Sequence, residues 1–149
     1  MSLGTTAIHA SRPKIGYMPV SRMRALVVDD STTILHAICT LLEHHELVNV
    51  VGRSESGQET IDVALELKPD LVLMDADMPG MSGLRTALLL SQMLPQTSII
   101  LMSMDTSTQF KTACAGCGAS AVVYKPKFLK ELSTLLRRPL KKTASVLNL

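Results

Sequence analysis

Long apolar runs are missing from this sequence. Although 46% of its 149 residues are hydrophobic, no stretch is long enough to span a membrane or to form the apolar segment of a secretory signal peptide. We therefore expect a cytoplasmic protein that makes no contact with a membrane. The length suits one domain whose core is large enough to fold alone.

Cysteine is also scarce. The three cysteines, Cys39, Cys114 and Cys117, leave an odd thiol and indicate no disulfide framework. Cys114 and Cys117 have the C-x-x-C spacing of redox pairs, but such pairs usually open a helix, where the helix terminus lowers the thiol pKa. Here the pair closes a predicted helix, and no second cysteine pair or histidine pair completes a zinc site. We interpret the pair as structural.

Acidic residues are almost absent from the two ends of the chain. Residues 1–24 carry four bases and no acid, residues 125–149 carry seven bases and one acid, and residues 25–124 carry twelve acids against four bases. A basic tail can contact nucleic acid. No aromatic pattern and no DNA-reading helix accompanies these ends, so we interpret them as solvated flanks of an acidic centre.

The predicted boundaries follow from composition. Residues 1–22 contain scattered Ser, Thr, Gly and Pro and are expected to be a flexible N-terminal extension. Residues 23–138 are expected to form the domain, and residues 139–149 a basic C-terminal tail.

Short apolar runs alternate with helical patterns along the domain. The predicted strands are residues 24–28, 47–51, 71–75, 98–103 and 121–124. The apolar faces expected for the first two helices are Ile34, Leu35, Ile38, Leu41 and Leu42, and then Ile61, Ala64, Leu65 and Leu67, with Ser56 and Glu59 forming a capping box before the second. The later helices are expected at 83–93, at about 106–116, and from Phe128 to Leu136. This alternation predicts an α/β fold with a doubly wound, five-stranded parallel sheet.

The stretch from Leu71 to Gly83 is central to the function. Its first four residues are apolar, as in a strand buried on both faces, and the strand ends on Asp75. Pro79, Gly80 and Gly83 then bend the chain and allow a close backbone approach. Ligands of open α/β sheets bind at the carboxyl ends of the strands, so we predict that Asp75 is the reactive group.

Polar residues also lie at the carboxyl ends of three other predicted strands. Asp29 and Asp30 follow the first strand, Ser103 ends the fourth and Lys125 follows the fifth. With strand order 2-1-3-4-5, the first and third strands are neighbours and the acids converge. Clustered carboxylates need a hard cation such as Mg2+, and a carboxylate can accept a phosphoryl group.

At this point the chain resembles the receiver domain of two-component response regulators, over about residues 23–138. The matching segments are Val27-Val28-Asp29-Asp30-Ser31, Asp75 to Gly83, Ser103, and Gly118-Ala119-Ser120 leading to Lys125-Pro126. The resemblance implies a flavodoxin-like fold and a signalling module that catalyses only its own phosphorylation and dephosphorylation. The segments Val50-Val51-Gly52 and Ser56-Gly57-Gln58-Glu59 look most like receivers that precede a helix-turn-helix DNA-binding domain. We expect no such domain in this chain.

The resemblance also implies roles for individual residues. Asp75 accepts the phosphoryl group from a sensor histidine kinase or a phosphotransfer protein, and Ser103 and Lys125 hold that group. Asp30 binds Mg2+ directly, Asp29 binds it through water, Asp77 binds it through its main-chain carbonyl, and Asp75 is the fourth residue of the metal site. Receivers of this kind have a cis peptide before the proline, so Lys125-Pro126 is expected to be cis.

Two departures affect the expected output. Many receivers have Tyr or Phe three residues before the lysine that corresponds to Lys125, and this chain has Val122 there. Receivers usually have a small residue directly after the hydroxyl residue that corresponds to Ser103, and this chain has Met104 there. We therefore expect phosphorylation to move the Met104–Asp105 loop and the fourth helix while Val122 keeps its rotamer. The output surface is expected on helix 4, strand 5 and helix 5. Its lysines and arginines favour an acidic protein surface or a second copy as the partner, over DNA.

Two alternatives belong to other functional classes. An apolar strand followed by Asp75-Ala76-Asp77 also resembles the nucleophile motif of haloacid-dehalogenase-type phosphatases, but that family places its metal-binding acidic pair after the lysine, and here Asp29 and Asp30 come first. A receiver that binds partners without phosphorylation is the third possibility. Met104 keeps it open, because this side chain can narrow access to the phosphoryl site.

Overall fold

The computed structural model of the chain describes residue 16 and residues 21–140. Most of the expected flexible extension (1–22) and of the expected basic tail (139–149) therefore lies outside the described residues.

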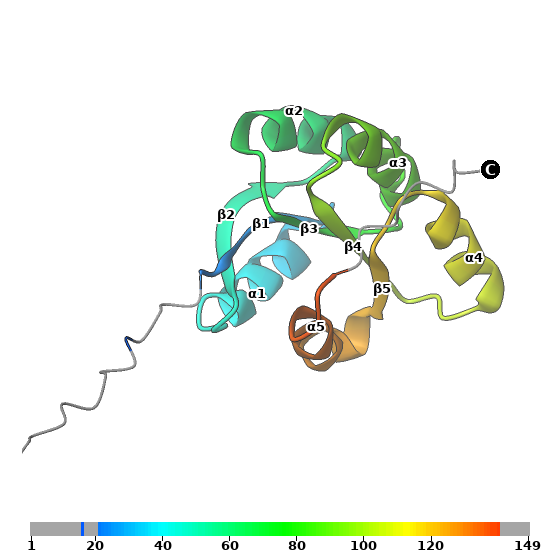
Figure 1. Cartoon of the computed structure of the whole chain (residues 1–149). Coiled ribbons are helices and arrows are strands. Elements are labelled where there is room, and N and C mark those ends of the chain that lie inside the picture. The colour runs from blue at the N-terminus through cyan, green and yellow to red at the C-terminus, as the bar shows by residue number, and fades with distance from the viewer. Residues whose placement is uncertain (1–15, 17–20, 141–149) are drawn as a thin grey trace, which may run out of the picture.

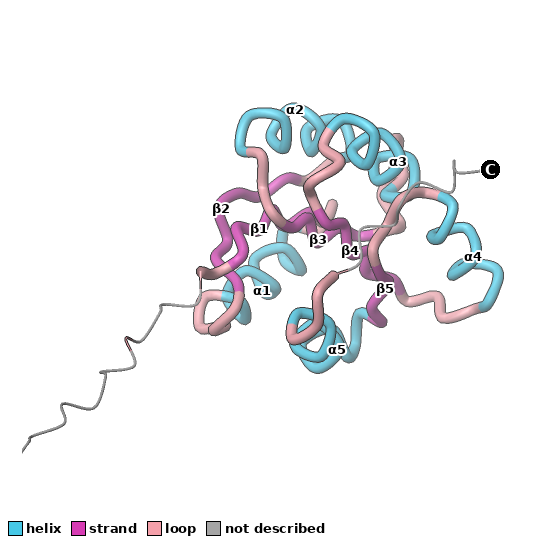
Figure 2. The backbone as a smooth tube through the Cα atoms, in the orientation of Figure 1, coloured by secondary structure: helices cyan, strands magenta, loops and turns pink. Residues whose placement is uncertain are grey.

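Strands and helices alternate strictly through the described part of the chain, as Figures 1 and 2 show. The strands are β1 (Met23–Val28), β2 (Val48–Ser54), β3 (Leu71–Asp75), β4 (Ser98–Ser103) and β5 (Ala121–Tyr124). The helices are α1 (Thr32–Leu42), α2 (Gly57–Leu67), α3 (Gly83–Met93), α4 (Thr108–Gly116) and α5 (Phe128–Leu136), and a single 3-10 turn, η1 (Lys125–Lys127), joins β5 to α5. None of the described helices is long and apolar enough to cross a membrane.

The five strands form one parallel sheet in the order β2-β1-β3-β4-β5, as predicted. In Figure 1, α1 and α5 lie on one side of the sheet, and α2 and α3 lie on the other. Because side chains alternate along a strand, β1 contributes Leu26 and Val28 to the core under α2, α3 and α4, and Ala25 and Val27 to the core under α1 and α5. β3 is buried along its whole length, so its last residue, Asp75, is fixed at the centre of the sheet edge.

Serine residues cap four of the five α-helices. Ser31, Ser56, Ser82 and Ser107 each accept a hydrogen bond at the side-chain oxygen from the N–H three residues later. This bond satisfies one of the N–H groups that a helix start leaves without a partner. The predicted capping box of α2 is half formed, because the Glu59 carboxylate accepts from the N–H of Glu55.

The predicted apolar faces were too wide. Ile34 and Leu41 of α1 are 40% and 50% exposed, and Leu65 of α2 is 38% exposed. Ile34 and Leu41 are seven residues apart and so lie on one stripe of the helix, at the edge of the face that Leu35, Ile38, Cys39 and Leu42 bury. On α1 and α2, the arc of the helix that contacts the sheet is narrower than the arc that the apolar residues of the helix occupy.

Cys114 and Cys117 lie at the end of α4, and both are buried free thiols. The thiol of Cys117 donates to the carbonyl oxygen of Cys114 at 2.9 Å. Burial raises the pKa of both thiols, to about 11 for Cys114. A thiol of this kind stays protonated at neutral pH, which favours the structural interpretation of the pair.

Candidate functional site

Three carboxylates meet at the carboxyl end of the sheet. Asp29 and Asp30 follow β1, Asp75 ends the neighbouring strand β3, and one oxygen of each carboxylate lies within 4.8 Å of the others. Asp29 is fully buried and Asp75 is 4% exposed, whereas Asp30 is exposed. The cluster is therefore a buried acidic pair that opens to solvent at Asp30.

Lys125 neutralises part of this negative charge. Its ammonium nitrogen lies 2.8 Å from Oδ2 of Asp29 and 3.2 Å from Oδ2 of Asp75. The other oxygens of these acids accept backbone N–H groups: Oδ1 of Asp29 accepts from Ser31 at 2.9 Å, and Oδ1 of Asp75 accepts from Asp77 at 3.1 Å. These contacts hold both carboxylates in a fixed orientation.

The electrostatics of the site follow from burial and charge. Burial raises the pKa of Asp75 above its ordinary value, against the opposing effects of the Asp77 N–H and the Lys125 ammonium, and the negative charge of Asp29 raises it further. For Lys125, burial lowers the pKa, but the hydrogen bond to Asp29 and the charges of Asp75 and Asp29 outweigh it and leave the pKa raised. A second positive charge near Asp75 would favour its ionised form.

A close backbone approach at Gly83 shapes the loop after Asp75. The N–H of Gly83 donates to the carbonyl oxygen of Ala76 at 3.0 Å. A Cβ at Gly83 would lie 2.2 Å from the carbonyl oxygen of Asp75 and 2.7 Å from Cα of Ala76. Only glycine therefore lets α3 begin directly against the end of β3, and the turn from Asp75 to Gly83 depends on it.

The other two predicted site residues, Ser103 and Asp77, also lie at the carboxyl end of the sheet, but only the Ser103 side chain is buried. Ser103 is fully buried at the end of β4, and its hydroxyl oxygen accepts the N–H of Asp105 at 2.9 Å. The side chain of Asp77 is exposed and does not belong to the carboxylate cluster.

The expected cis peptide at Lys125-Pro126 is wrong, because the described residues contain no cis peptide bond. The chain turns instead through η1, in which Pro126 occupies the first turn and needs no N–H partner there. This turn is sufficient to direct Lys125 back to Asp29.

The donor set fits a hard divalent cation. Three carboxylates within 4.8 Å offer only oxygen ligands, and the exposed position of Asp30 leaves room for water. Mg2+ usually keeps several waters and binds proteins through one or two carboxylates. Asp29, Asp30 and Asp75 are therefore the residues that would hold it.

Sequence reasoning missed the roles of two side chains close to the site. Oδ1 of Asp105 accepts the N–H of Ser107 at 2.7 Å, and Oε2 of Glu131 accepts the N–H of Tyr124 at 2.7 Å. For Asp105 a signal was present, since Ser, Asp and Ser alternate at 103, 105 and 107, and such residues often bond the backbone two positions later. Glu131 gave no signal, because its partner belongs to another element.

Comparisons with known proteins agree with this geometry. A family model described as the response regulator receiver domain matches residues 25–137. The response regulator GacA of Pseudomonas viridiflava is 34% identical over 115 residues, which are 77% of this chain and 54% of that protein. A protein-glutamate methylesterase/protein-glutamine glutaminase of Pseudomonas putida is 34% identical over 111 residues, 74% of this chain and 30% of that protein. The chain thus spans about half or less of these relatives.

Solved structures share the fold. The isolated REC domain of RcsB from Salmonella enterica serovar Typhimurium, determined in the presence of the phosphomimetic BeF3-, superposes with a TM-score of 0.71 at 26% identity, covering 80% of this chain and 91% of that one. A DNA-binding response regulator of the LuxR family from Staphylococcus aureus gives a TM-score of 0.72 at 18% identity, covering 80% and 99%. The second likeness concerns the fold alone.

Proposed function

Because the chain belongs to the family of response regulator receiver domains, we propose that it accepts a phosphoryl group on the carboxylate of Asp75 in a Mg2+-dependent reaction. The observation that carries the proposal is the position of Lys125, whose ammonium bridges Asp29 and Asp75. This arrangement places one fixed positive charge next to the proposed acceptor and two further carboxylates beside it for a cation.

The proposed reaction transfers the phosphoryl group from a phosphohistidine of a sensor kinase or phosphotransfer protein. A carboxylate oxygen of Asp75 attacks phosphorus, the bond from phosphorus to the imidazole nitrogen breaks, and the leaving histidine takes the bonding electron pair. Such transfers depend mainly on positioning and on neutralising charge. Bound Mg2+ supplies positive charge at the phosphoryl oxygens.

The remaining roles belong to this chain's own residues. Asp29, Asp30 and Asp75, with the main-chain carbonyl of Asp77, are proposed to hold the cation. Lys125 is proposed to contact a phosphoryl oxygen as a compact point charge. Ser103 is proposed to donate its hydroxyl hydrogen to another phosphoryl oxygen. The product is the phosphorylated protein itself, which acts as a signalling module, and no product of turnover is released. We propose that residues 23–138 form the domain that carries this site and that the protein acts in the cytoplasm.

Intact mass after incubation with acetyl phosphate and Mg2+ tests this proposal. Wild type should gain the mass of one phosphoryl group, and Asp75→Asn should gain none. Asp62→Asn is the matched control, because Asp62 is an exposed acid on α2. Removing Mg2+ with a chelator should stop the gain, since the carboxylates would then repel the incoming anion. Equal labelling of Asp75→Asn and wild type would refute the assignment.

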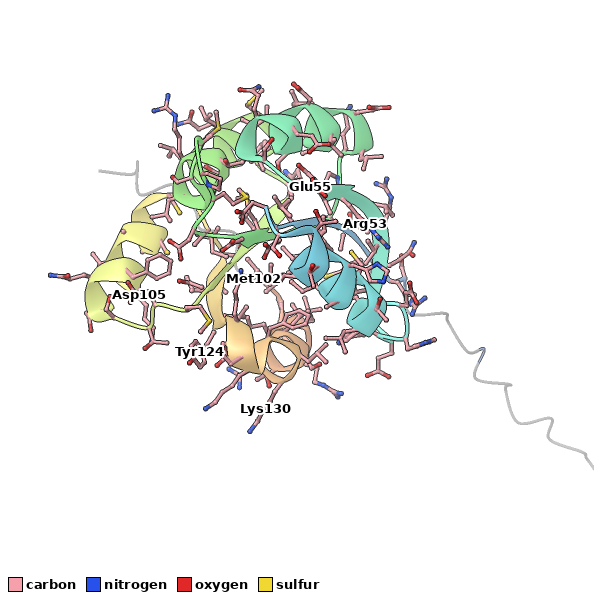
Figure 3. All side chains as sticks on the ribbon, turned by 180° about the vertical axis from the view of Figure 1, so that it is seen from behind. Arg53, Glu55, Met102, Asp105, Tyr124 and Lys130 are labelled. Carbon is pink, nitrogen blue, oxygen red and sulfur yellow. The ribbon has the colours of Figure 1, made fainter. Side chains whose placement is uncertain are left out.

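We further propose that the phosphorylated form acts through the face of α4, β5 and α5. A hollow of about 470 Å3 lies there, lined in part by Lys111, Lys127 and Lys130. Figure 3 shows Asp105, Tyr124 and Lys130 on this side of the molecule. The two acids of the hollow, Asp105 and Glu131, accept backbone N–H groups, so the lysines favour an acidic partner segment.

An NMR titration with a glutamate-rich peptide tests this surface. Shift changes should concentrate at the hollow in the presence of Mg2+ and BeF3-, and the double variant Lys127→Glu/Lys130→Glu should abolish them. Lys68→Glu, on the C-cap of α2, is the control for a charge reversal outside the hollow. Peptide binding that both variants leave unchanged would exclude the hollow as the acidic-partner site.

A further inference from the structure

Ser54 and Thr60 bring two buried hydroxyl groups into contact at the carboxyl end of β2. Their oxygens lie 2.9 Å apart, and Ser54 is 1% exposed while Thr60 is fully buried. The Thr60 hydroxyl donates to the carbonyl oxygen of Ser56 at 2.6 Å, and because this bond uses its only hydrogen, Ser54 is the donor between the two side chains. The other acceptors near the Ser54 hydroxyl, the Ser56 carbonyl and the Glu59 carboxylate, are farther away, at 3.1 and 3.3 Å. The hydroxyl pair therefore joins the last residue of β2 to the start of α2.

A bulge in β2 brings Ser54 to this position. The pairing of β1 with β2 skips Val51, so that Val28 at the end of β1 lies opposite Ser54. Without the extra residue, Val28 would lie opposite Arg53. Residues paired across a sheet point to the same face, and Val28 faces the core under α2, α3 and α4. The bulge therefore places a small hydroxyl side chain under α2 in place of an arginine.

The backbone of Ser54 reaches the proposed metal site directly. Its carbonyl oxygen accepts the N–H of Asp29 at 3.2 Å, and Asp29 is the fully buried acid of the carboxylate cluster. A second link joins exposed side chains, since the hydroxyl of Thr32 donates to the carboxylate of Glu55 at 3.2 Å. Asp29 and Thr32 lie on either side of Asp30 in the sequence. The two links therefore hold the acidic loop after β1 against the end of β2.

The helix that carries Thr60 is itself fixed against the turn after Asp75. At Gly57, the first residue of α2, an added Cβ would lie 2.7 Å from the carbonyl oxygen of Met81. The start of α2 thus approaches the backbone of this turn as closely as glycine allows. Because α2 cannot shift here without disturbing the turn, Thr60 is a fixed support for the end of β2.

We propose that Ser54 and Thr60 are positioning residues of the metal site, in which the hydroxyl pair fixes the end of β2 and the Ser54 carbonyl then fixes Asp29. The inference rests on the proposed function, in which Asp29, Asp30 and Asp75 hold a divalent cation. Both hydroxyls act through Asp29 and are not ligands. Residues that orient the ligands of a metal contribute to its affinity, so loss of the pair should weaken binding of the cation.

Amide hydrogen exchange of the metal-free protein, resolved by residue with NMR, tests the first step. The measured quantity is the exchange rate of the Asp29 N–H divided by that of the Ala76 N–H, which donates to the carbonyl oxygen of Met102 at the same edge of the sheet. Thr60→Val keeps the shape of the side chain and removes the hydroxyl, and it should raise this ratio about fivefold, the effect of losing one hydrogen bond. Thr60→Ser retains the hydroxyl and should keep the wild-type ratio. An unchanged ratio in Thr60→Val would overturn the proposal.

Isothermal titration calorimetry with Mg2+ alone tests the consequence for the metal site. Thr60→Val and Ser54→Ala should each weaken binding about tenfold, the lower end of the cost of removing a residue that orients a metal ligand. Thr60→Ser should bind Mg2+ as wild type does. The double variant Ser54→Ala/Thr60→Val should lose no more affinity than either single variant, because the two hydroxyls act as one unit. Losses that add would contradict this unit.

Thr97→Val is the matched control. The Thr97 hydroxyl donates to the carbonyl oxygen of Pro69 at 2.7 Å, and Thr97 precedes β4 at the opposite end of the sheet from the acids. This variant removes the same kind of bond and should change neither the exchange ratio nor the Mg2+ affinity. If it loses as much affinity as Thr60→Val, the effect is a general loss of stability and the positioning role is wrong. If wild type binds no Mg2+, the proposed function fails instead, and the exchange ratio still shows whether the hydroxyl pair holds Asp29.

Discussion

The ammonium of Lys125 lies 2.8 Å from Oδ2 of Asp29, closer than it lies to the proposed acceptor, Asp75. Asp29 is also the more buried of the two acids. Burying a carboxylate without a partner is costly, so this ion pair is what makes the buried position of Asp29 tolerable in the absence of a metal. Lys125 and a divalent cation would therefore act on the same two carboxylates.

Replacing Lys125 with alanine should tighten Mg2+ binding. Removal of a positive charge beside the ligand carboxylates eliminates about 1 kcal/mol of repulsion, or about fivefold in affinity. Isothermal titration calorimetry measures this change, and Lys127→Ala, an exposed lysine in the same turn, is the control. The metal-free Lys125→Ala protein should also be less stable by about 1–3 kcal/mol, since two acids lose their partner. Unchanged Mg2+ affinity would contradict the proposed metal site.

Gly83 and Gly116 should respond in opposite ways to alanine. A Cβ at Gly83 would meet backbone atoms of Asp75 and Ala76 at 2.2 and 2.7 Å, so Gly83→Ala should lower the free energy of unfolding by about 1–3 kcal/mol. Gly116 ends α4 with nothing within 4 Å of an added Cβ, and Gly116→Ala should raise it by about 0.5–1 kcal/mol. Urea unfolding of both variants measures the difference. Equal stabilities would show that the Asp75–Gly83 turn can relax.

The fold could be predicted from the sequence because its signals are local. Most strands are short apolar runs, and α3, β4 and β5 have the predicted bounds, whereas β2 extends to Ser54 through the polar residues that follow its apolar run. The convergence of Asp29, Asp30, Asp75 and Lys125 was also predictable, since strand order and strand ends determine it. What failed depends on contacts between elements. The extent of burial at Ile34 and Leu41 is set by how α1 rests on the sheet, and the Glu131 contact requires α5 to lie beside β5.

Stability should fall at high pH through Cys114. Burial raises the pKa of this thiol from 9.0 to about 11. A group whose pKa is higher in the folded state stabilises the fold fully below its unfolded pKa, and this contribution is lost as pH rises through the folded value. Between about pH 9 and pH 11 the loss should reach about 2 kcal/mol.

Comparison with Cys114→Ala isolates this effect from the titration of other groups. The difference in unfolding free energy between wild type and Cys114→Ala, measured by urea unfolding, should shrink between about pH 8 and about pH 10.5. The cavity left by the variant changes the difference by an amount that does not depend on pH. A difference that stays constant over this range would show that Cys114 keeps an ordinary pKa.

The final prediction concerns which residues move on activation. Val122 has a single stiff χ1 rotor and is held against the core that contains Cys114, whereas residues 104–107 are exposed and held by side-chain to backbone bonds. We therefore expect structures determined with and without Mg2+ and BeF3- to differ over residues 104–116 and to agree in the Val122 rotamer. Residues 104–107 can move without breaking core packing, whereas the Val122 side chain cannot. A pair of structures in which 104–116 superpose while Val122 or Tyr124 flips would contradict this switch.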